Sequence, residues 1–462
     1  MSNSININKP QLTTKQLKLQ ECKAGKKLVI STNWLPLFGF EETSLTVEEL
    51  IGPNEGIRIR VASLFDTDTK KVYTRRYTTR KNNPIETMLD IRKQSLINEA
   101  FPEDTTQVHV VFKQNEITIT PITNRQAEAI KSFKKSDNKL STFLACSSGI
   151  DGYCLEKEGF TIETLLEYRP NEKRDKKDLS ETGALNALAN ISPKYLINEN
   201  IMNLDLEKLA ALTCKSKSTL FHISLQCDDF SNVKAKSLKD KSVNDTSSTL
   251  NMTIDALNLI QKFNFPTVLI ENVKGFSSSD IGKMTRVRLQ RLGYSIHNMI
   301  LNARDFGGYT NRERNYLFAT LLPAEFTPPV EIQKDEKSLW NTFIEPRILK
   351  GELREVSNSK SIQDGLKCGR ARMIKRDSVF TPTFLKSQDR MAKDSVILFD
   401  EVRNKIFFPS NELVAELMGI SREFTFDAVS KTIESEIIGQ SVEVPLHSAI
   451  LQSIKEHIEK SR

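Results

Sequence analysis

Short apolar runs separated by glycine, proline and asparagine mark the first part of the chain. Runs of this length, bounded by turn-forming residues, are typical of β-strands. The runs are residues 28–30, 57–61, 72–73, 107–112 and 117–119. We expect a small, mainly-β domain over residues 25–122, with room for one helix at residues 84–100. The polar residues 1–24 predict a flexible arm, residues 123–140 predict a linker, and no internal repeat is apparent.

The rhythm changes at residue 141, where strand-like apolar runs begin to alternate with stretches of helical length. The runs are residues 142–145, 162–166, 218–225, 267–270, 295–302 and 316–321. This alternation favours an α/β fold with a doubly wound, mostly parallel sheet, whose core we place at residues 141–322. Residues 323–405 mix proline, charge and short apolar runs, which indicates an inserted lobe. Helical patterning returns over residues 406–462 and predicts a closing helix.

Composition narrows the class of protein. The 462 residues are 38% hydrophobic and 27% charged, which is typical of a soluble globular protein. No apolar run reaches the roughly 18 residues that a transmembrane helix needs, and no secretory signal is visible. The six cysteines form no Cys-x-x-Cys pair, so we expect neither a disulfide framework nor a zinc site, and a cytoplasmic or nucleoid-associated protein. The net charge of +7 permits a nucleic-acid partner.

Chemistry is expected where residues 223–231 (ISLQCDDFS) turn from apolar to polar. In open α/β sheets, ligands bind at the carboxyl ends of the strands, and Cys227 stands at such an end. A lone buried cysteine more often packs than reacts, so the neighbouring motifs decide the interpretation of Cys227. His222, on the same run, is interpreted as a core histidine, and Cys146 and Cys154 as packing residues.

Several polar segments follow one another in a specific order. They are residues 143–152 (FLACSSGIDG), Glu167, and residues 198–201 (NENI), 227–231 (CDDFS), 271–273 (ENV), 305–314 (DFGGYTNRER), 409–419 (PSNELVAELMG) and 438–446 (IGQSVEVPL). In this order they resemble the DNA cytosine-5 methyltransferases over roughly residues 141–457. The resemblance implies a Rossmann-like methyltransferase core, a target-recognition lobe at 323–405, and a return to the core at 406–462.

The resemblance also implies the reaction and its partners. It implies S-adenosylmethionine as cofactor, double-stranded DNA as partner, no membrane partner, a monomer, and a role in restriction-modification. Cys227 would attack cytosine C6 as a thiolate, and Glu271 would act as an acid beside cytosine N3. Asn272 would brace the loop, Arg312 would point at the base carbonyl and the cysteine loop, and Arg314 would brace the structure. A base inside a duplex would have to be flipped out.

The same resemblance implies a set of cofactor-binding residues. They are Phe143, Ala145, Ser147, Gly149, Glu167, Asn200, Ile201, Gln440, Ser441 and Val442. Glu167 would bind ribose hydroxyls, and Asn200 stands at or beside the position of the adenine-contacting aspartate. The glycine-rich turn of the family is altered here, because Cys146, Ser147 and Ser148 occupy much of it.

The altered turn and the residues that flank Cys227 depart from the family pattern and leave alternatives open. The family's Pro-Cys-Gln is Gln226-Cys227-Asp228 here, and nearby carboxylates disfavour a thiolate. One alternative is therefore a methyltransferase-like DNA-binding protein that has lost catalysis, and another is a tRNA cytosine-5 methyltransferase. The segment 28–40 loosely resembles small DNA-binding β-barrels of the AbrB and SymE type. The basic run 75–81 could touch phosphates or form a solvated strand face.

Overall fold

A computed structural model describes residues 8–81, 84–171, 175–213, 217–226, 230, 249–332 and 337–462. The chain divides into two compact units, residues 1–128 and residues 129–462. Among the described residues, no helix combines the length and the apolar character needed to cross a bilayer.

The first unit consists mainly of strands in two sheets. Its elements are β1 (Leu12–Lys18), β2 (Gln20–Cys22), β3 (Gly25–Ser31), η1 (Pro36–Phe38), β4 (Leu45–Gly52), β5 (Gly56–Val61), β6 (Lys70–Lys71), β7 (Tyr73–Arg76), β8 (Ile85–Ile91), α1 (Gln94–Ala100), β9 (Gln107–Lys113) and β10 (Glu116–Ile122). One sheet has the order β1-β9-β10-β5-β4-β6 and the other β2-β3-β8-β7. Their alternate apolar side chains form a single core.

The strand orders reveal an internal duplication of this unit. If β1–β5 are exchanged one by one for β6–β10, each sheet shows the same strand order read in the opposite direction. The two halves are therefore related by a pseudo-twofold axis. The core repeats accordingly. Leu28, Ile30, Leu35 and Phe40 recur 61 positions later as Leu89, Ile91, Leu96 and Phe101, and all eight are buried. The expectation of no repeat is therefore wrong. The surface residues between these apolar positions differ and obscure the repeat.

The arm and linker expected around this unit take part in the folded structure. Residues 12–18, expected in the arm, form β1 and pair with β9 from Leu12↔Lys113 to Lys18↔Gln107. An edge strand can be mostly polar, because only alternate side chains face the core, and this composition made it look unstructured. Residues 125–135, expected in the linker, form helix α2 (Arg125–Lys135), which buries Ala129 and Phe133 in the second unit.

The second unit is built on a seven-stranded sheet of order β13-β12-β11-β14-β15-β18-β16. The strands are β11 (Ser141–Ala145), β12 (Thr161–Leu166), β13 (Tyr195–Ile197), β14 (Leu220–Ser224), β15 (Thr267–Val273), β16 (Ser295–Asn302) and β18 (Glu313–Thr320). Strands β11 to β15 are parallel, and β18 pairs antiparallel with both β15 and β16. The mixed α/β class is confirmed, and the order reverses beside β11, where α/β sheets usually bind ligands.

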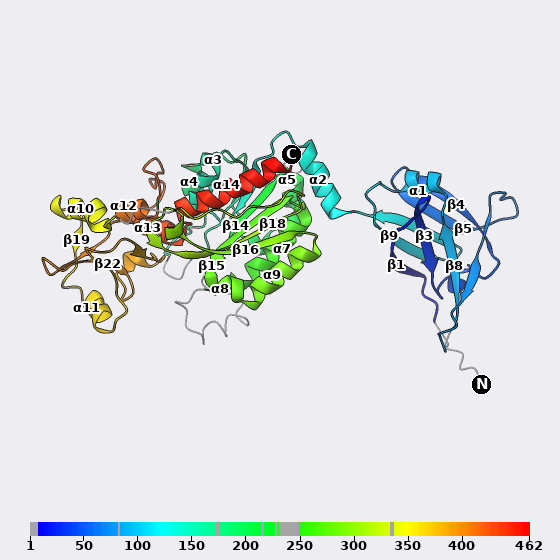
Figure 1. The fold of residues 1–462 in the computed structure, drawn as a ribbon, viewed down its shortest axis with the longest axis horizontal. Helices are drawn as coiled ribbons and strands as arrows, with labels where there is room; N and C mark the ends of the chain where they lie inside the picture. The colour runs from blue at the N-terminus through cyan, green and yellow to red at the C-terminus, as the bar shows by residue number, and fades with distance from the viewer. Residues whose placement is uncertain are drawn as a thin grey trace. The chain divides into compact units, whose positions relative to one another are not determined.

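Helices cover both faces of this sheet (Figure 1). The helices are α3 (Ile150–Lys157), α4 (Thr182–Leu188), α5 (Leu206–Leu212), α7 (Met252–Phe263), α8 (Lys274–Ser278), α9 (Asp280–Arg291) and α14 (Val444–Lys460). Phe143 and Ala145 point into the core formed with α5, α7 and α9, whereas Leu144 between them points into the core formed with α3 and α14. Burial on both faces explains why these strands read as continuous apolar runs.

A third core joins the inserted lobe to the helices that follow it. The lobe has a small sheet of order β19-β23-β22-β20, made of β19 (Arg354–Glu355), β20 (Arg372–Ile374), β22 (Val396–Asp400) and β23 (Lys405–Phe408). Its core also contains side chains of α12 (Asn411–Leu417) and α13 (Lys431–Gln440). The lobe sheet therefore extends to Phe408, beyond the expected boundary at residue 405.

Candidate functional site

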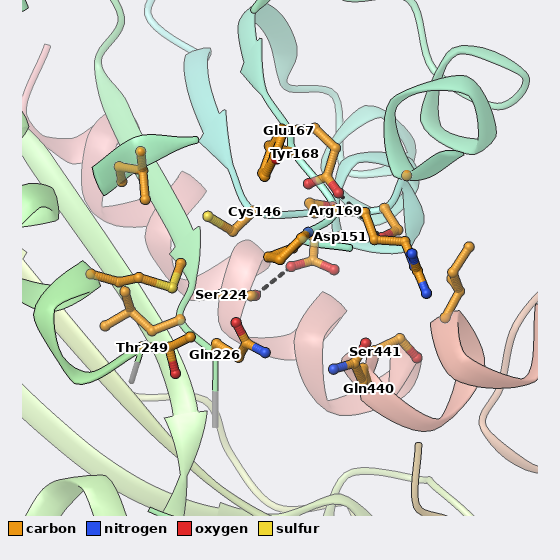
Figure 2. Close-up of a pocket in the computed structure, with 18 of the residues that line it drawn as sticks. Cys146, Asp151, Glu167, Tyr168, Arg169, Ser224, Gln226, Thr249, Gln440 and Ser441 are labelled. Carbon is orange, nitrogen blue, oxygen red and sulfur yellow. Dashed lines mark hydrogen bonds between the residues drawn. The ribbon is translucent and has the colours of Figure 1, made fainter. Parts of the chain in front are cut away.

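A cavity of about 400 Å³ lies at the carboxyl ends of β11, β12, β14 and β15. Figure 2 shows Cys146 and Glu167 on one side of it, Ser224 near its centre, and Gln440 and Ser441 on the opposite side. Because parallel strands all end at the same edge, this one cavity collects residues from segments far apart in the sequence.

The turn after β11 forms one wall of the cavity. Cys146 adopts a left-handed conformation (φ 57°), and Gly149 at the start of α3 does so too (φ 115°). A Cβ atom on Gly149 would lie 2.9 Å from the Cα of Ala187, so this glycine allows helix α4 to pack closely. Ser147 lines the cavity, whereas Gly149 does not. Phe143 and Ala145 also lie away from the cavity, buried in the core beneath the turn.

Glu167, directly after β12, places a buried carboxylate on the cavity wall. One carboxylate oxygen accepts a hydrogen bond from the Ser148 hydroxyl at 3.5 Å, and the other has no hydrogen-bond partner among the described residues. Burial and the nearby Asp151 raise the pKa of Glu167 to about 7. Gly183 leaves room for this carboxylate, since a Cβ there would lie 2.2 Å from its oxygen.

The remaining predicted cofactor residues come from two further segments and all line the cavity. They are Asn200, Ile201, Gln440, Ser441 and Val442. The Asn200 side chain accepts a hydrogen bond from the Met202 backbone N–H at 3.0 Å, which caps the short helix η2 (Ile201–Asn203). The Ser441 hydroxyl donates to the carbonyl of Ile438 at 2.9 Å, where helix α13 ends.

Glu271 and Arg314 form an ion pair on the cavity wall. Antiparallel pairing of β15 with β18 brings the two together, and Arg314 Nε lies 3.2 Å from Glu271 Oε1. Both side chains line the cavity, and Glu271 is only 6% exposed. Burial raises the pKa of Glu271, and the charge of Arg314 only partly opposes this effect. Asn272 points away from the cavity and donates to the Leu225 carbonyl at 3.4 Å, two residues before Cys227.

The structure places the two arginines in different surroundings. Arg312 is 1% exposed and does not line the cavity. Its guanidinium donates to the carbonyls of Phe384 (3.1 Å), Gly439 (3.2 Å) and Ser441 (2.7 Å). The physical reason is that strand β17 (Thr310–Asn311) pairs with β21 (Thr381–Pro382) of the lobe and turns Arg312 toward it. Among the described residues, Arg312 thus contacts carbonyls of the lobe and of the end of α13, whereas Arg314 lines the cavity.

The proposed nucleophile, Cys227, lies outside the described residues, as does Asp228. The last described residue before it, Gln226, lines the cavity.

Three groups near the cavity were missed by the sequence reasoning. Asp151 accepts a hydrogen bond from the Ser224 hydroxyl at 2.5 Å and lies 3.3 Å from His222 Nε2. Burial disfavours the Asp151 carboxylate, but the nearby His222 imidazole and the hydrogen bond from Ser224 outweigh this effect and lower the pKa of Asp151. Arg169 also lines the cavity and is ion-paired with Asp175 at 2.7 Å. Lys386 reaches the cavity from the lobe. Asp151, within the altered turn, carried the only recognisable signal.

The α/β fold of the second unit is shared with solved structures. The fold is similar to the crystal structure of the S. pombe Dnmt2 methyltransferase, with a TM-score of 0.52 and 18% identity, covering 69% of this chain and 98% of that one. It is also similar to the Entamoeba histolytica methyltransferase EhMeth, with a TM-score of 0.51 and 18% identity, covering 70% of this chain and 99% of that one.

Sequence comparison finds similarity to one family of methyltransferases. Residues 189–368 match the family model of the C-5 cytosine-specific DNA methylases. Over 246 residues the chain is 29% identical to the type II methyltransferase M.NlaX of Neisseria lactamica, covering 50% of this chain and 73% of that protein. It is 28% identical over 215 residues to M1.ScrFI of Lactococcus lactis subsp. cremoris, covering 42% and 52%. The chain is thus similar to the C-5 cytosine-specific DNA methylases over residues 189–368 and to type II methyltransferases over about half of its length.

Proposed function

We propose that this protein transfers a methyl group from S-adenosylmethionine to C5 of cytosine in double-stranded DNA, through a covalent bond to Cys227. The observation that carries the proposal is the Glu271–Arg314 pair, which faces the same cavity as the Glu167 carboxylate, one oxygen of which has no hydrogen-bond partner among the described residues. One cavity thus offers an acid for a base ring and an acceptor for a sugar.

The fit of the cofactor rests on Glu167. A buried carboxylate oxygen without a partner is costly, and a ligand with hydroxyl donors would satisfy it. Ribose has two neighbouring hydroxyls that suit a carboxylate. The small residues Ser147 and Ser148 allow a ligand to approach the turn, although they replace glycines of the family. When bound, S-adenosylmethionine supplies an electrophilic methyl group.

The proposed chemistry needs groups that this chain carries. The Cys227 thiolate adds to cytosine C6 and forms an S–C6 bond, while the electrons of the ring shift toward N3. Glu271 donates a proton to N3, and its raised pKa keeps that proton available. Arg314 holds the carboxyl group in place and faces the base. After C5 is methylated, C5 loses its proton to solvent, the S–C6 bond breaks to release the thiolate, and N3 returns its proton to Glu271.

The testing experiment measures label from S-adenosylmethionine in unmethylated DNA, with wild type beside Cys227→Ser. The expected result is labelled 5-methylcytosine with wild type and none with the variant. Cys368→Ser serves as the matched control, since that cysteine is exposed on the lobe. DNA containing 5-fluorocytosine should trap wild type covalently, because fluorine blocks the loss of the C5 substituent.

Three other outcomes would contradict the proposal. If labelled 5-methylcytosine still formed with Cys227→Ser, the covalent mechanism through Cys227 would be wrong. Label that enters tRNA in preference to DNA would show that tRNA, and not DNA, is the substrate. No label in either nucleic acid, with DNA still bound, would identify a methyltransferase-like protein that has lost catalysis.

A further inference from the structure

The two halves of the N-terminal unit differ in the length of one hairpin. In the first half, Cys22 pairs with Gly25, and two residues close the turn. The equivalent pair in the second half is Arg75↔Glu86, since Glu86 lies 61 positions after Gly25, as Leu89 does after Leu28. Ten residues separate Arg75 from Glu86. The second hairpin is therefore eight residues longer, although the fold closes without this extension in the first half.

The longer hairpin is strongly basic. Residues 70–81 contain six cationic side chains and no acidic one. Those of Lys71, Arg75, Arg76 and Lys81 are exposed, and none of the ion pairs among the described residues includes them. Lys70 and Arg80, by contrast, pair with Glu48 and Glu86. The extension thus adds uncompensated positive charge, which repels itself and contributes nothing to the core.

An aromatic ring organises part of this charge. The guanidinium groups of Arg75 and Arg80 lie 5.2 Å and 4.0 Å from the centre of the Tyr77 ring. Stacking of this kind reduces the freedom of long side chains and presents their donors outward. Strand β7, which carries Arg75 and Arg76, is an edge strand of the four-stranded sheet.

The main alternative is that these charges only protect a sheet edge. One or two lysines are enough for that purpose, and mixed signs are usual on a solvated surface. Arginines dominate the strand here, and arginine suits the bidentate recognition of phosphate. A row of cations that outnumbers its acidic neighbour Glu86 is complementary to a regular array of phosphates, which a DNA duplex provides.

We propose that Arg75, Arg76 and Lys81 bind the backbone of double-stranded DNA and attach the chain to its substrate independently of sequence. The choice of DNA as the ligand rests on the proposed function of the second unit. The cationic surface itself is an observation that does not depend on that function. Phosphate contacts position a protein without reading bases. A second DNA-binding surface on one chain raises the local concentration of substrate, so it lowers the KM for DNA and leaves kcat unchanged.

The test uses the full-length chain and a short duplex of A·T pairs, which contains no target cytosine. Arg75→Ala/Arg76→Ala/Lys81→Ala is compared with Lys131→Ala/Lys134→Ala/Lys135→Ala, which removes three exposed charges from helix α2. Counterion release predicts roughly a fivefold loss of affinity per phosphate contact at about 0.15 M salt. It also predicts that the slope of log K against log salt becomes shallower by up to about 2.7 for three contacts. We expect both changes in the hairpin variant.

A hairpin shortened by eight residues, to the length found in the first half, should lose affinity to the same extent. The inference is overturned if both hairpin variants bind the duplex as tightly as the α2 variant does. It is also overturned if duplex RNA of equal length competes better than DNA for the wild-type hairpin but not for the variants. Thermal unfolding of each variant establishes that the chain has folded.

Methyl transfer separates this inference from the proposed function. A hairpin variant with raised KM for cytosine-containing DNA and unchanged kcat supports both. Weaker DNA binding by the variant, together with no methyl transfer by wild type, supports the surface and contradicts the enzyme. Methyl transfer by wild type, together with unaltered DNA binding by the hairpin variant, contradicts the proposed DNA-binding surface and leaves the proposed enzyme in place.

Discussion

Glu167 and Glu271 face the same cavity from the ends of β12 and β15, yet their surroundings differ. Both carboxylates are buried, and burial raises the pKa of both. Glu271 has the cation Arg314 at 3.2 Å, whereas one oxygen of Glu167 has no hydrogen-bond partner among the described residues. The free protein thus supplies a partner to one carboxylate and leaves the other incomplete.

The difference indicates how the cavity is divided. A carboxyl group with a fixed partner keeps one orientation, which an acid in a reaction needs. A carboxyl group that lacks a partner gains most from a ligand that brings hydrogen-bond donors. We therefore infer a reacting side at Glu271 and a cofactor side at Glu167, and the predictions below test that division.

The largest expected effect is on the reacting side. Glu271→Gln keeps the size of the side chain but removes the acidic proton that the proposed mechanism needs. We expect single-turnover methyl transfer to fall by roughly 10²–10⁴-fold, with binding of S-adenosylmethionine nearly unchanged.

Glu167→Gln is the matched substitution on the other side. Loss of a charged acceptor costs about 1.5 kcal/mol, or roughly tenfold in the affinity for S-adenosylmethionine, with a smaller effect on the rate at saturation. If the two variants showed the same pattern, the division of the cavity would be wrong.

The next pair of substitutions concerns Arg314 and Arg312. Arg314→Ala removes the charge-assisted contact to Glu271, which should lower the rate of methyl transfer by about 10- to 100-fold. The pKa of Glu271 should rise further, because Arg314 lowers it. Thermal stability should change little, since Arg314 opens onto the cavity.

Arg312→Ala should affect stability first. It leaves the buried carbonyls of Phe384, Gly439 and Ser441 without their donor, at a cost on the order of 3 kcal/mol. Denaturant unfolding of the two variants, side by side, measures the contrast. A stable Arg312→Ala protein with a strongly reduced rate would instead support the role expected from sequence.

The contrast between the arginines also marks the limit of sequence reasoning. Strand periodicity and motif order place Glu167 and Glu271 at the same sheet edge, and the structure gives both a place on the cavity wall. Periodicity could not separate Arg312 from Arg314, which stand two residues apart. Their directions depend on a pairing with residues 381–382 of the lobe, about 70 positions away.

Two other features were hidden for comparable reasons. Asp151 was not singled out within the altered turn, because its partners Ser224 and His222 lie over 70 positions further along. The duplication in the first unit is carried by buried residues such as Leu35 and Leu96. Strands of both copies occur in each sheet, so the duplication is recognised most readily from the strand order.

The smallest predicted effect is a dependence of cofactor binding on pH. The pKa of Glu167 in the free protein is raised from 4.5 to about 7, chiefly by burial. A ligand that donates two hydrogen bonds favours the ionised carboxylate, so binding below pH 7 must first remove a proton. The Kd for S-adenosylmethionine should therefore rise as pH falls below about 7, by up to about tenfold per pH unit, and level off above it.

Stability of the free protein should follow the opposite trend. A raised pKa means that Glu167 contributes stability below pH 4.5 and that this contribution is lost as pH rises through about 7. The free protein should thus unfold at lower temperature as pH approaches 7, while the stabilisation by S-adenosylmethionine grows. Measuring Kd and unfolding temperature across this range, with Glu167→Gln as control, isolates Glu167 from the titrating groups of the ligand. Identical pH profiles for wild type and Glu167→Gln would mean that the ribose is bound elsewhere, and the cofactor side of the cavity would have to be reassigned.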